Sequence, residues 1–174
     1  MSKRYEDVER YGILNFPCGV ERLDNGHTLI ADAGDDHQRG SEILEVDEKG
    51  QIVWSYGEGL NFAHSTQKLS NGNILVTDTT NNRVIEITPD KEIALTSDDW
   101  NNGTGELSDG SHLDYPNDAH ELKDGTLLIT DRNNDRCIIS DRSGNVLWSY
   151  NDDIKHPHNS DMLANGNIII CDSD

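Results

Sequence analysis

The chain has 174 residues, a formal net charge of −19 at pH 7 and a hydrophobic content of 33%. A chain of this length can bury one ordinary hydrophobic core, and its acidity leaves no basic patch that would favour nucleic acid or an anionic membrane as a partner. No apolar run reaches the roughly 18 residues of a membrane-spanning helix.

The first segment, residues 1–15, is charged and lacks the apolar stretch of a secretory signal. Its text YEDVERYGIL would suit an outer strand that closes a small ring. The three cysteines, Cys18, Cys137 and Cys171, are an odd number, and we expect buried free thiols and a cytoplasmic location. The acidity itself fits either ordinary solubility or a high-salt host.

Residues 16–174 contain four copies of one sequence pattern, the last of them partial. A turn glycine recurs as Gly26, Gly72, Gly125 and Gly166, and a period of roughly 40 to 50 residues indicates an array of supersecondary units. Asn-Gly stands at three of these turns and Asp-Gly at one, which predicts type I′ hairpins. Each full unit is predicted as four short antiparallel strands, which is the pattern of a β-propeller blade.

The fold class is therefore all-β, with about three and a half propeller blades. We expect an incomplete part of a larger ring, whose open apolar ends pair with another copy or with further blades. The predicted boundaries are blade 1 at about 16–57, blade 2 at about 62–100, an insert loop at 97–114, blade 3 at about 115–150 and a partial blade 4 at about 156–174.

Trp54 and Trp148 fall at matching places in two repeats, which predicts that both pack between blades. The insert with its flanks, residues 97–118, is rich in Asp, Asn and Gly. We interpret it as a flexible loop that could cover the channel mouth, and a calcium loop is the alternative. An aspartate ends each second strand and is interpreted as a turn cap or a partner of Arg83 or Arg136, rather than a metal ligand. These aspartates are Asp32, Asp78, Asp131 and Asp172.

The text NGNILVTDTTNNRVIEI resembles NHL-type propeller repeats. The fuller pattern, carried by HSTQKLSNGNILVTD with QIVWSYG and by HPHNSDMLANGNIIICD with NVLWSYN, is similar to arylsulfotransferase-like propellers. That resemblance implies transfer of a sulfuryl group between phenols through a histidine, with histidines and an arginine lining the central channel.

The positions that match the channel are the starts of the innermost strands. The resemblance implies His64 and His158 as catalytic residues, and Cys18, Asn117, Ser65, Asp118 and Asn159 as ligand-binding residues. They form two columns across the repeats: Cys18, His64, Asn117, His158, and Gly19, Ser65, Asp118, Asn159.

The two columns contain no arginine or lysine, although sulfate oxygens need a cation or N–H donors nearby. Arg83 and Arg136 are expected away from the axis, so the cation would come from blades outside this sequence. The function is predicted as an arylsulfotransferase-like propeller with a small-molecule ligand and no cofactor or metal. The alternative is a propeller scaffold that binds a ligand or a protein without chemistry.

Overall fold

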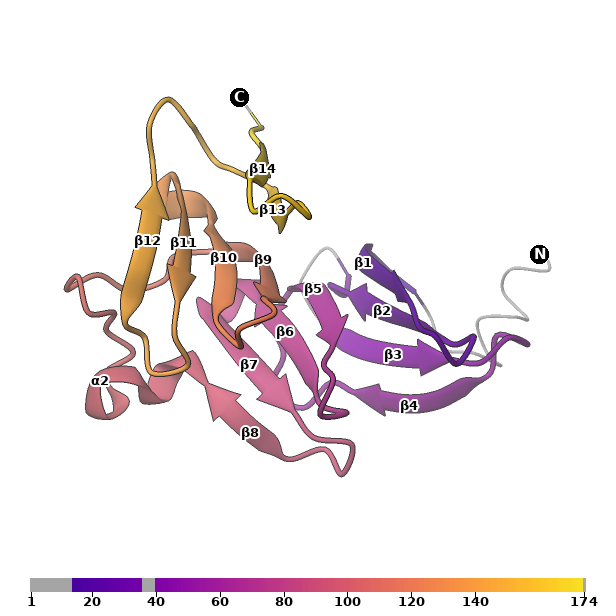
Figure 1. The fold of residues 1–174 in the computed structure, drawn as a ribbon. Helices are drawn as coiled ribbons and strands as arrows, with labels where there is room; N and C mark the ends of the chain where they lie inside the picture. The colour runs from indigo at the N-terminus through magenta and orange to yellow at the C-terminus, as the bar shows by residue number, and fades with distance from the viewer. Residues whose placement is uncertain (1–13, 36–39, 174) are drawn as a thin grey trace.

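The computed structural model describes residues 14–35 and 40–173. The predicted closing strand within residues 1–15 lies almost wholly outside these residues. Three antiparallel sheets of four strands and one of two strands follow each other along the chain (Figure 1). In every sheet the strands lie in sequence order, because tight hairpins join neighbours. The sheets form an open arc rather than a closed ring, which confirms an all-β fold of propeller blades.

The bounds of the elements follow the repeat. Blade 1 contains β1 (Pro17–Arg22), β2 (Thr28–Asp32), β3 (Glu42–Val46) and β4 (Ile52–Tyr56). Blade 2 contains β5 (Ala63–Lys68), β6 (Ile74–Asp78), η1 (Thr79–Asn81), β7 (Arg83–Ile87) and β8 (Ile93–Thr96). The insert forms η2 (Ser97–Asp99) and α2 (Trp100–Gly103). Blade 3 contains β9 (Pro116–Glu121), β10 (Leu127–Asp131), η3 (Arg132–Asn134), β11 (Arg136–Ser140) and β12 (Val146–Tyr150), and the fourth sheet contains β13 (Asn159–Met162) and β14 (Ile168–Cys171).

The second strand of each inner blade is buried on both faces. All five residues of β6 and all five of β10 are buried, which explains why their text is a continuous apolar run rather than an alternating one. One core cluster joins blades 1 and 2, and a second joins blades 2 and 3. Stability therefore comes from stacking neighbouring blades, as expected for a repeat protein.

The turn between the first and second strand differs from the predicted type I′. Gly26 has φ +84°, whereas Asn25 does not have a positive φ, so only one turn residue is left-handed. The N–H of Gly26 donates to the Leu23 carbonyl at 3.0 Å. Oδ1 of Asn25 accepts the N–H of His27 at 2.9 Å. The side chain holds the asparagine right-handed, and the hairpin is a type I turn followed by a left-handed glycine.

The insert is packed into the molecule. Trp100, Leu107 and Leu113 are buried in the cluster between blades 2 and 3, and Nε1 of Trp100 donates to the carbonyl of Arg142 at 3.0 Å. The interpretation as a flexible loop was therefore wrong. These three apolar side chains anchor the insert. They are spaced along a mostly polar sequence, so the overall composition of the insert did not reveal them.

Trp54 packs against the cluster between blades 1 and 2, and its Nε1 donates to the Pro89 carbonyl at 2.9 Å. Trp148 is 36% exposed and stacks on Tyr150, so its prediction as a core residue was wrong. The reason is the fourth sheet, which has only two strands among the described residues. Cys137 is buried as expected, but Cys171 on β14 is exposed for the same reason.

Candidate functional site

The innermost strand of each full blade begins with a β-bulge. The register shifts between Pro17 and Gly19 on β1, between Ala63 and Ser65 on β5, and at the matching point of β9. Bulges re-aim the side chain of the extra residue. The extra residues are Cys18, His64 and Asn117, three members of the first predicted column.

A pocket of about 480 Å³ lies where the innermost strands of the blades begin, and we call it the axial pocket. It brings together His64, Asn117 and His158 from three different blades, whereas Cys18 does not line it. Its wall also includes a cation and three aromatic rings that the columns did not contain. The lining residues are Phe16, Phe62, His64, Tyr115, Asn117, Arg132, Asn133 and His158.

The two histidines form a contacting pair. The ring centroids of His64 and His158 are 4.8 Å apart, with the rings inclined at 70°. Nδ1 of His64 lies 2.8 Å from the carbonyl oxygen of Asn117. A carbonyl only accepts hydrogen bonds, so Nδ1 carries the proton and the lone pair of neutral His64 is on Nε2. Burial, and then the neighbouring His158, lowers the pKa of His64, which keeps the ring neutral near pH 7.

Arg132 supplies the cation that the two columns lacked. It is the first residue of η3, directly after Asp131, and its guanidinium carbon lies 6.0 Å from the centroid of the Tyr115 ring. In blade 2 the matching residue is Thr79, which is buried and donates to the Pro116 carbonyl. The signal was in the sequence: TDTTNNR and TDRNNDR differ at this position, within two otherwise similar turns.

An aromatic rim precedes each bulge. The ring centroid of Phe62 lies 5.9 Å from that of Phe16 and 6.2 Å from that of Tyr115. Phe62 and Tyr115 have φ values of 61° and 54°, a left-handed conformation that costs a bulky residue about 1–2 kcal/mol. Such strain persists only where neighbouring contacts enforce it.

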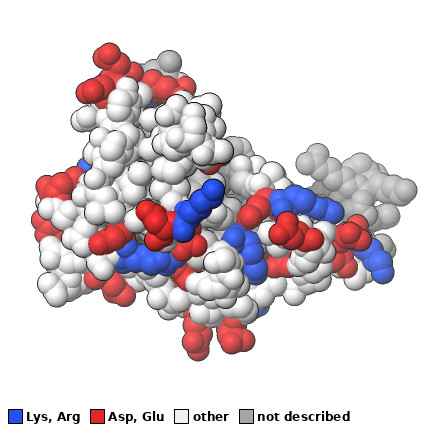
Figure 2. All heavy atoms as spheres, viewed as in Figure 1, with Lys and Arg blue, Asp and Glu red and all other residues white. Residues whose placement is uncertain are grey.

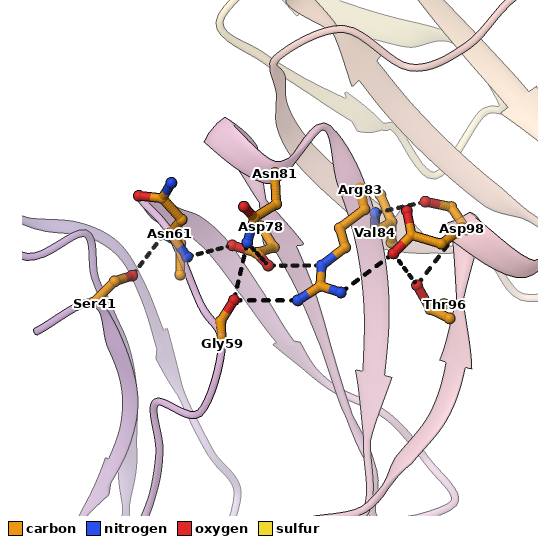
Figure 3. A network of polar contacts seen from close by, with 11 residues as sticks. Ser41, Gly59, Asn61, Asp78, Asn81, Arg83, Val84, Thr96 and Asp98 are labelled. Atoms are coloured by element: carbon orange, nitrogen blue, oxygen red, sulfur yellow. Dashed lines mark hydrogen bonds and ion pairs between the residues drawn. The ribbon is translucent and has the colours of Figure 1, made fainter. Parts of the chain in front are cut away.

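The aspartate column enforces this geometry. Oδ1 of Asp78 accepts the N–H of Asn61 at 2.6 Å, and its Oδ2 accepts Nε of Arg83 at 2.7 Å (Figure 3). Asn81 donates to the same carboxylate at 2.7 Å. Blade 3 repeats the arrangement, since Asp131 accepts the N–H of Asp114 and pairs with Asn134 and Arg136. The interpretation of these aspartates as structural caps is confirmed, and each clamp holds the segment that carries a rim residue.

The remaining predicted residues lie elsewhere. Ser65 and Asp118 are buried between blades, where Oγ of Ser65 accepts the N–H of Ala119 and Oδ2 of Asp118 accepts the N–H of Ser160. Asn159 is exposed at the start of β13. Burial and the nearby Asp32 raise the pKa of Cys18 to about 11, so its thiol stays protonated near pH 7. Within the described residues, none of these four lines the axial pocket.

A second hollow, of about 710 Å³, lies between blade 3 and the fourth sheet. Trp148, Tyr150, Ile168 and Ile170 line it, and uncharged atoms cover much of the region over β12 to β14 (Figure 2). It contains few polar groups that could orient a ligand. We interpret this groove as a packing face, because most of the side chains that line it are apolar.

Across residues 14–35 and 40–173, no three His, Cys, Asp or Glu side chains are grouped so that they could hold a metal ion. The same residues contain no helix that is long and apolar enough to cross a membrane.

No protein-family model matches the sequence, and a search of curated proteins finds no match. Solved structures do match. A protein of unknown function from Bacteroides caccae is 20% identical and has a TM-score of 0.67, with 90% of this chain and 56% of that one covered. Virginiamycin B lyase from Staphylococcus aureus is 16% identical and has a TM-score of 0.66, with 94% and 51% covered. The WD40 β-propeller domain of Doa1 is 11% identical and has a TM-score of 0.69, with 90% and 48% covered.

These likenesses show the β-propeller fold and nothing finer, because every identity is low. The chain spans about half the length of the structures that it matches. The closer resemblance to arylsulfotransferase-like propellers stays a prediction.

Proposed function

We propose that the axial pocket binds an aryl sulfate and that His64 accepts its sulfuryl group, as in the enzymes that the repeat text resembles. The observation that carries the proposal is the pairing of His64 with His158 beside Arg132. The hydrogen bond from Nδ1 to the Asn117 carbonyl leaves Nε2 of His64 as the nucleophile. Within the described residues, Nε2 has no protein partner.

Each other group then has a role. Arg132 binds the sulfate oxygens, where charge develops during transfer, and the rim of Phe16, Phe62 and Tyr115 stacks on the aryl ring. Oδ1 of Asn117 is buried and has no partner within the described residues, which leaves an acceptor at the wall for a ligand hydroxyl.

The reaction is written in two steps. Nε2 of His64 attacks sulfur, the bond from sulfur to the aryl oxygen breaks, and protonated His158 gives its proton to the departing phenolate. The resulting N-sulfo ring of His64 is held through its Nδ1–H by the Asn117 carbonyl. An acceptor phenol then attacks sulfur, the N–S bond breaks, and neutral His158 takes the phenol proton. Both histidines return to their starting states, as general acid–base catalysis requires.

The test follows release of a coloured phenol from its sulfate ester in the presence of a second phenol. His64→Ala should reduce the rate to background, and Arg132→Gln should reduce it by about 10²–10³-fold. The double variant His64→Ala, His158→Ala should lose little more than the worse single variant. His112→Ala is the matched control, since His112 is exposed and bonds the Thr104 carbonyl outside the pocket.

Two measurements separate the outcomes. With the donor ester alone, mass spectrometry of wild type should find one sulfuryl group on the peptide that contains His64. Turnover that persists in His64→Ala contradicts the mechanism. A third outcome is that the wild type binds the ester without turnover and that Arg132→Gln abolishes this binding. That outcome supports the alternative of a non-catalytic binding propeller, for which the aromatic rim is equally suited.

A further inference from the structure

The backbone carbonyl of Asn117 connects blade 3 to the axial pocket. Asn117 is the extra residue of the β9 bulge, so the register gives it no partner residue on β10. Its carbonyl oxygen faces blade 2, where it accepts Nδ1–H of His64 at 2.8 Å and the hydroxyl of Thr77 at 3.2 Å. A carbonyl oxygen has two lone pairs, so both donors can bind it at once.

Thr77 belongs to a buried pair of hydroxyl groups between blades 2 and 3. It is 0% exposed, and its Oγ1 accepts the N–H of Ser65 at 2.9 Å and lies 3.0 Å from Oγ of Ser65. Oγ of Ser65 in turn accepts the N–H of Ala119 at 3.2 Å. A hydroxyl has one proton to donate, and a carbonyl has none. Both contacts of Thr77 are therefore satisfied when Ser65 donates to Thr77 and Thr77 donates to the Asn117 carbonyl.

The matching positions of the neighbouring blades do not repeat this contact. In blade 1 the residue that matches Thr77 is Ala31, which has no hydroxyl. Ala31 belongs to the core cluster of blades 1 and 2, so a junction packs without a hydroxyl at this position. In blade 3 the matching residue is Thr130, whose Oγ1 instead lies 2.7 Å from Oγ of Ser160 on β13. Packing of the blades alone therefore does not explain why Thr77 binds the carbonyl that His64 uses.

We propose that Thr77 is a positioning residue for His64, whose proton it keeps on Nδ1 by holding the Asn117 carbonyl in place. With the proton on Nδ1, the lone pair of neutral His64 stays on Nε2. If the carbonyl turned away, the proton could move to Nε2 and the nucleophile would be lost. Thr77 is not one of the described residues that line the axial pocket, so it acts through His64 rather than on a ligand.

The catalytic part of this inference rests on the proposed function, whereas the effect on the His64 proton does not. The first experiment therefore reads that proton directly. Nitrogen NMR of the full chain with isotope-labelled histidine distinguishes a protonated ring nitrogen from an unprotonated one, and the spectrum of His64→Gln assigns the signals. In wild type, Nε2 of neutral His64 should be unprotonated.

Thr77→Val keeps the shape of the side chain and removes its hydroxyl. It should raise the population of His64 that carries the proton on Nε2, and Thr77→Ser, which keeps the hydroxyl, should give the wild-type signals. Thr130→Val is the matched control, because it makes the same change at the matching position of blade 3. Thr77→Ala gives blade 2 the residue that blade 1 has there, and it replaces Thr77→Val if that variant does not fold.

The second experiment follows transfer from the coloured ester to a second phenol. In Thr77→Val, kcat should fall about tenfold or more, because a histidine in the wrong tautomer does not act as the nucleophile. KM should change little, since Thr77 does not line the pocket. Thr77→Ser and Thr130→Val should both stay close to wild type.

Unchanged His64 signals in Thr77→Val overturn the proposal, and so does an equal change in Thr130→Val, which would show a general loosening of the blade junctions. A wild type in which His64 carries its proton on Nε2 also overturns it. A shift of the proton in Thr77→Val, in a protein whose wild type has no turnover, supports the positioning of His64 by Thr77 and contradicts sulfuryl transfer instead.

Discussion

His120 lies on the innermost strand of blade 3, with Nε2 3.1 Å from Oδ2 of Asp118. The hydrogen bond to Asp118 raises its pKa, with help from Asp161 and Glu21, although burial acts in the opposite direction. A raised pKa in the folded state means that the native protein holds this proton more tightly than the unfolded chain. The contribution to stability is thus fully present below the unfolded pKa of about 6.5 and is lost as pH rises through the folded pKa.

We therefore predict that His120→Gln flattens the pH dependence of stability. Between about pH 6 and 8, the free energy of unfolding should fall more steeply with pH in wild type than in the variant. Urea unfolding at each pH measures the difference. His112→Gln, which alters an exposed histidine, should follow wild type. Parallel curves for wild type and His120→Gln would show that the pair with Asp118 is not charged in this range.

At the same scale, the site was predictable in part. The repeat placed His64 and His158 at strand starts, because a column of a repeat occupies one position in space. It could not place Arg132, since that residue is in a 3₁₀ turn and only the three-dimensional arc brings the turn to the pocket. The second column was equally ambiguous, because alternation along a strand sends Ser65 and Asp118 into the blade junctions instead.

The element that locks blades 2 and 3 together is the insert. Its Trp100 ring lies over the turn between β11 and β12, where a Cβ added to Gly144 would come within 2.9 Å of the indole. Arg142 in the same turn pairs with Glu86 of blade 2 and with Glu121. The turn between β11 and β12 of blade 3 thus packs against the insert that follows blade 2.

We predict that Gly144→Ala destabilises the protein more than Gly125→Ala. Both glycines have positive φ, +81° and +85°, but nothing lies within 4 Å of a Cβ at Gly125. Gly125→Ala should cost about 1–2 kcal/mol from backbone strain alone. The contact with Trp100 should add about 1–3 kcal/mol at Gly144.

Thermal and urea unfolding of both variants measure the two costs. In a Trp100→Ala background, the cost of Gly144→Ala should fall but stay above that of Gly125→Ala, because alanine keeps the Cβ of residue 100, which lies 3.0 Å from a Cβ added at Gly144. Equal costs in the native background would show that the indole moves aside freely.

Elements were easier to predict than their turns. Continuous apolar runs marked β6 and β10, because both faces of an inner strand are covered. The type I′ turn failed because Asn-Gly fits more than one hairpin, and the Asn25 side chain decided in favour of another. The prediction that Trp148 is a core residue was wrong because a similar sequence in two repeats does not guarantee that both are covered by a similar neighbouring blade.

For the whole molecule, the dominant long-range term is charge. Acidic side chains are scattered over much of the face in Figure 2, with fewer basic ones among them. Their mutual repulsion favours expanded states. We predict that the melting temperature rises between 0.1 and about 1 M KCl, where the Debye length falls to about 3 Å.

A variant with Asp152→Asn and Asp153→Asn, two exposed changes, should melt higher than wild type at low salt and gain less from KCl. Differential scanning calorimetry compares the two proteins. A melting temperature that falls with KCl in wild type would mean that the ion pairs of the aspartate clamps outweigh the repulsion.

The three tryptophans of the chain have different surroundings, so their fluorescence reports on different parts of the molecule. Trp100 is 3% exposed at the junction of blades 2 and 3, whereas Trp148 is 36% exposed beside the fourth sheet. Indole emission shifts with solvent contact, so the buried ring reports on the central blades and the exposed ring on the end of the arc. A dissolved quencher reaches Trp148 first, and its access falls when anything covers that end. The unequal surroundings of near-identical repeats thus provide an optical probe of assembly without an added label.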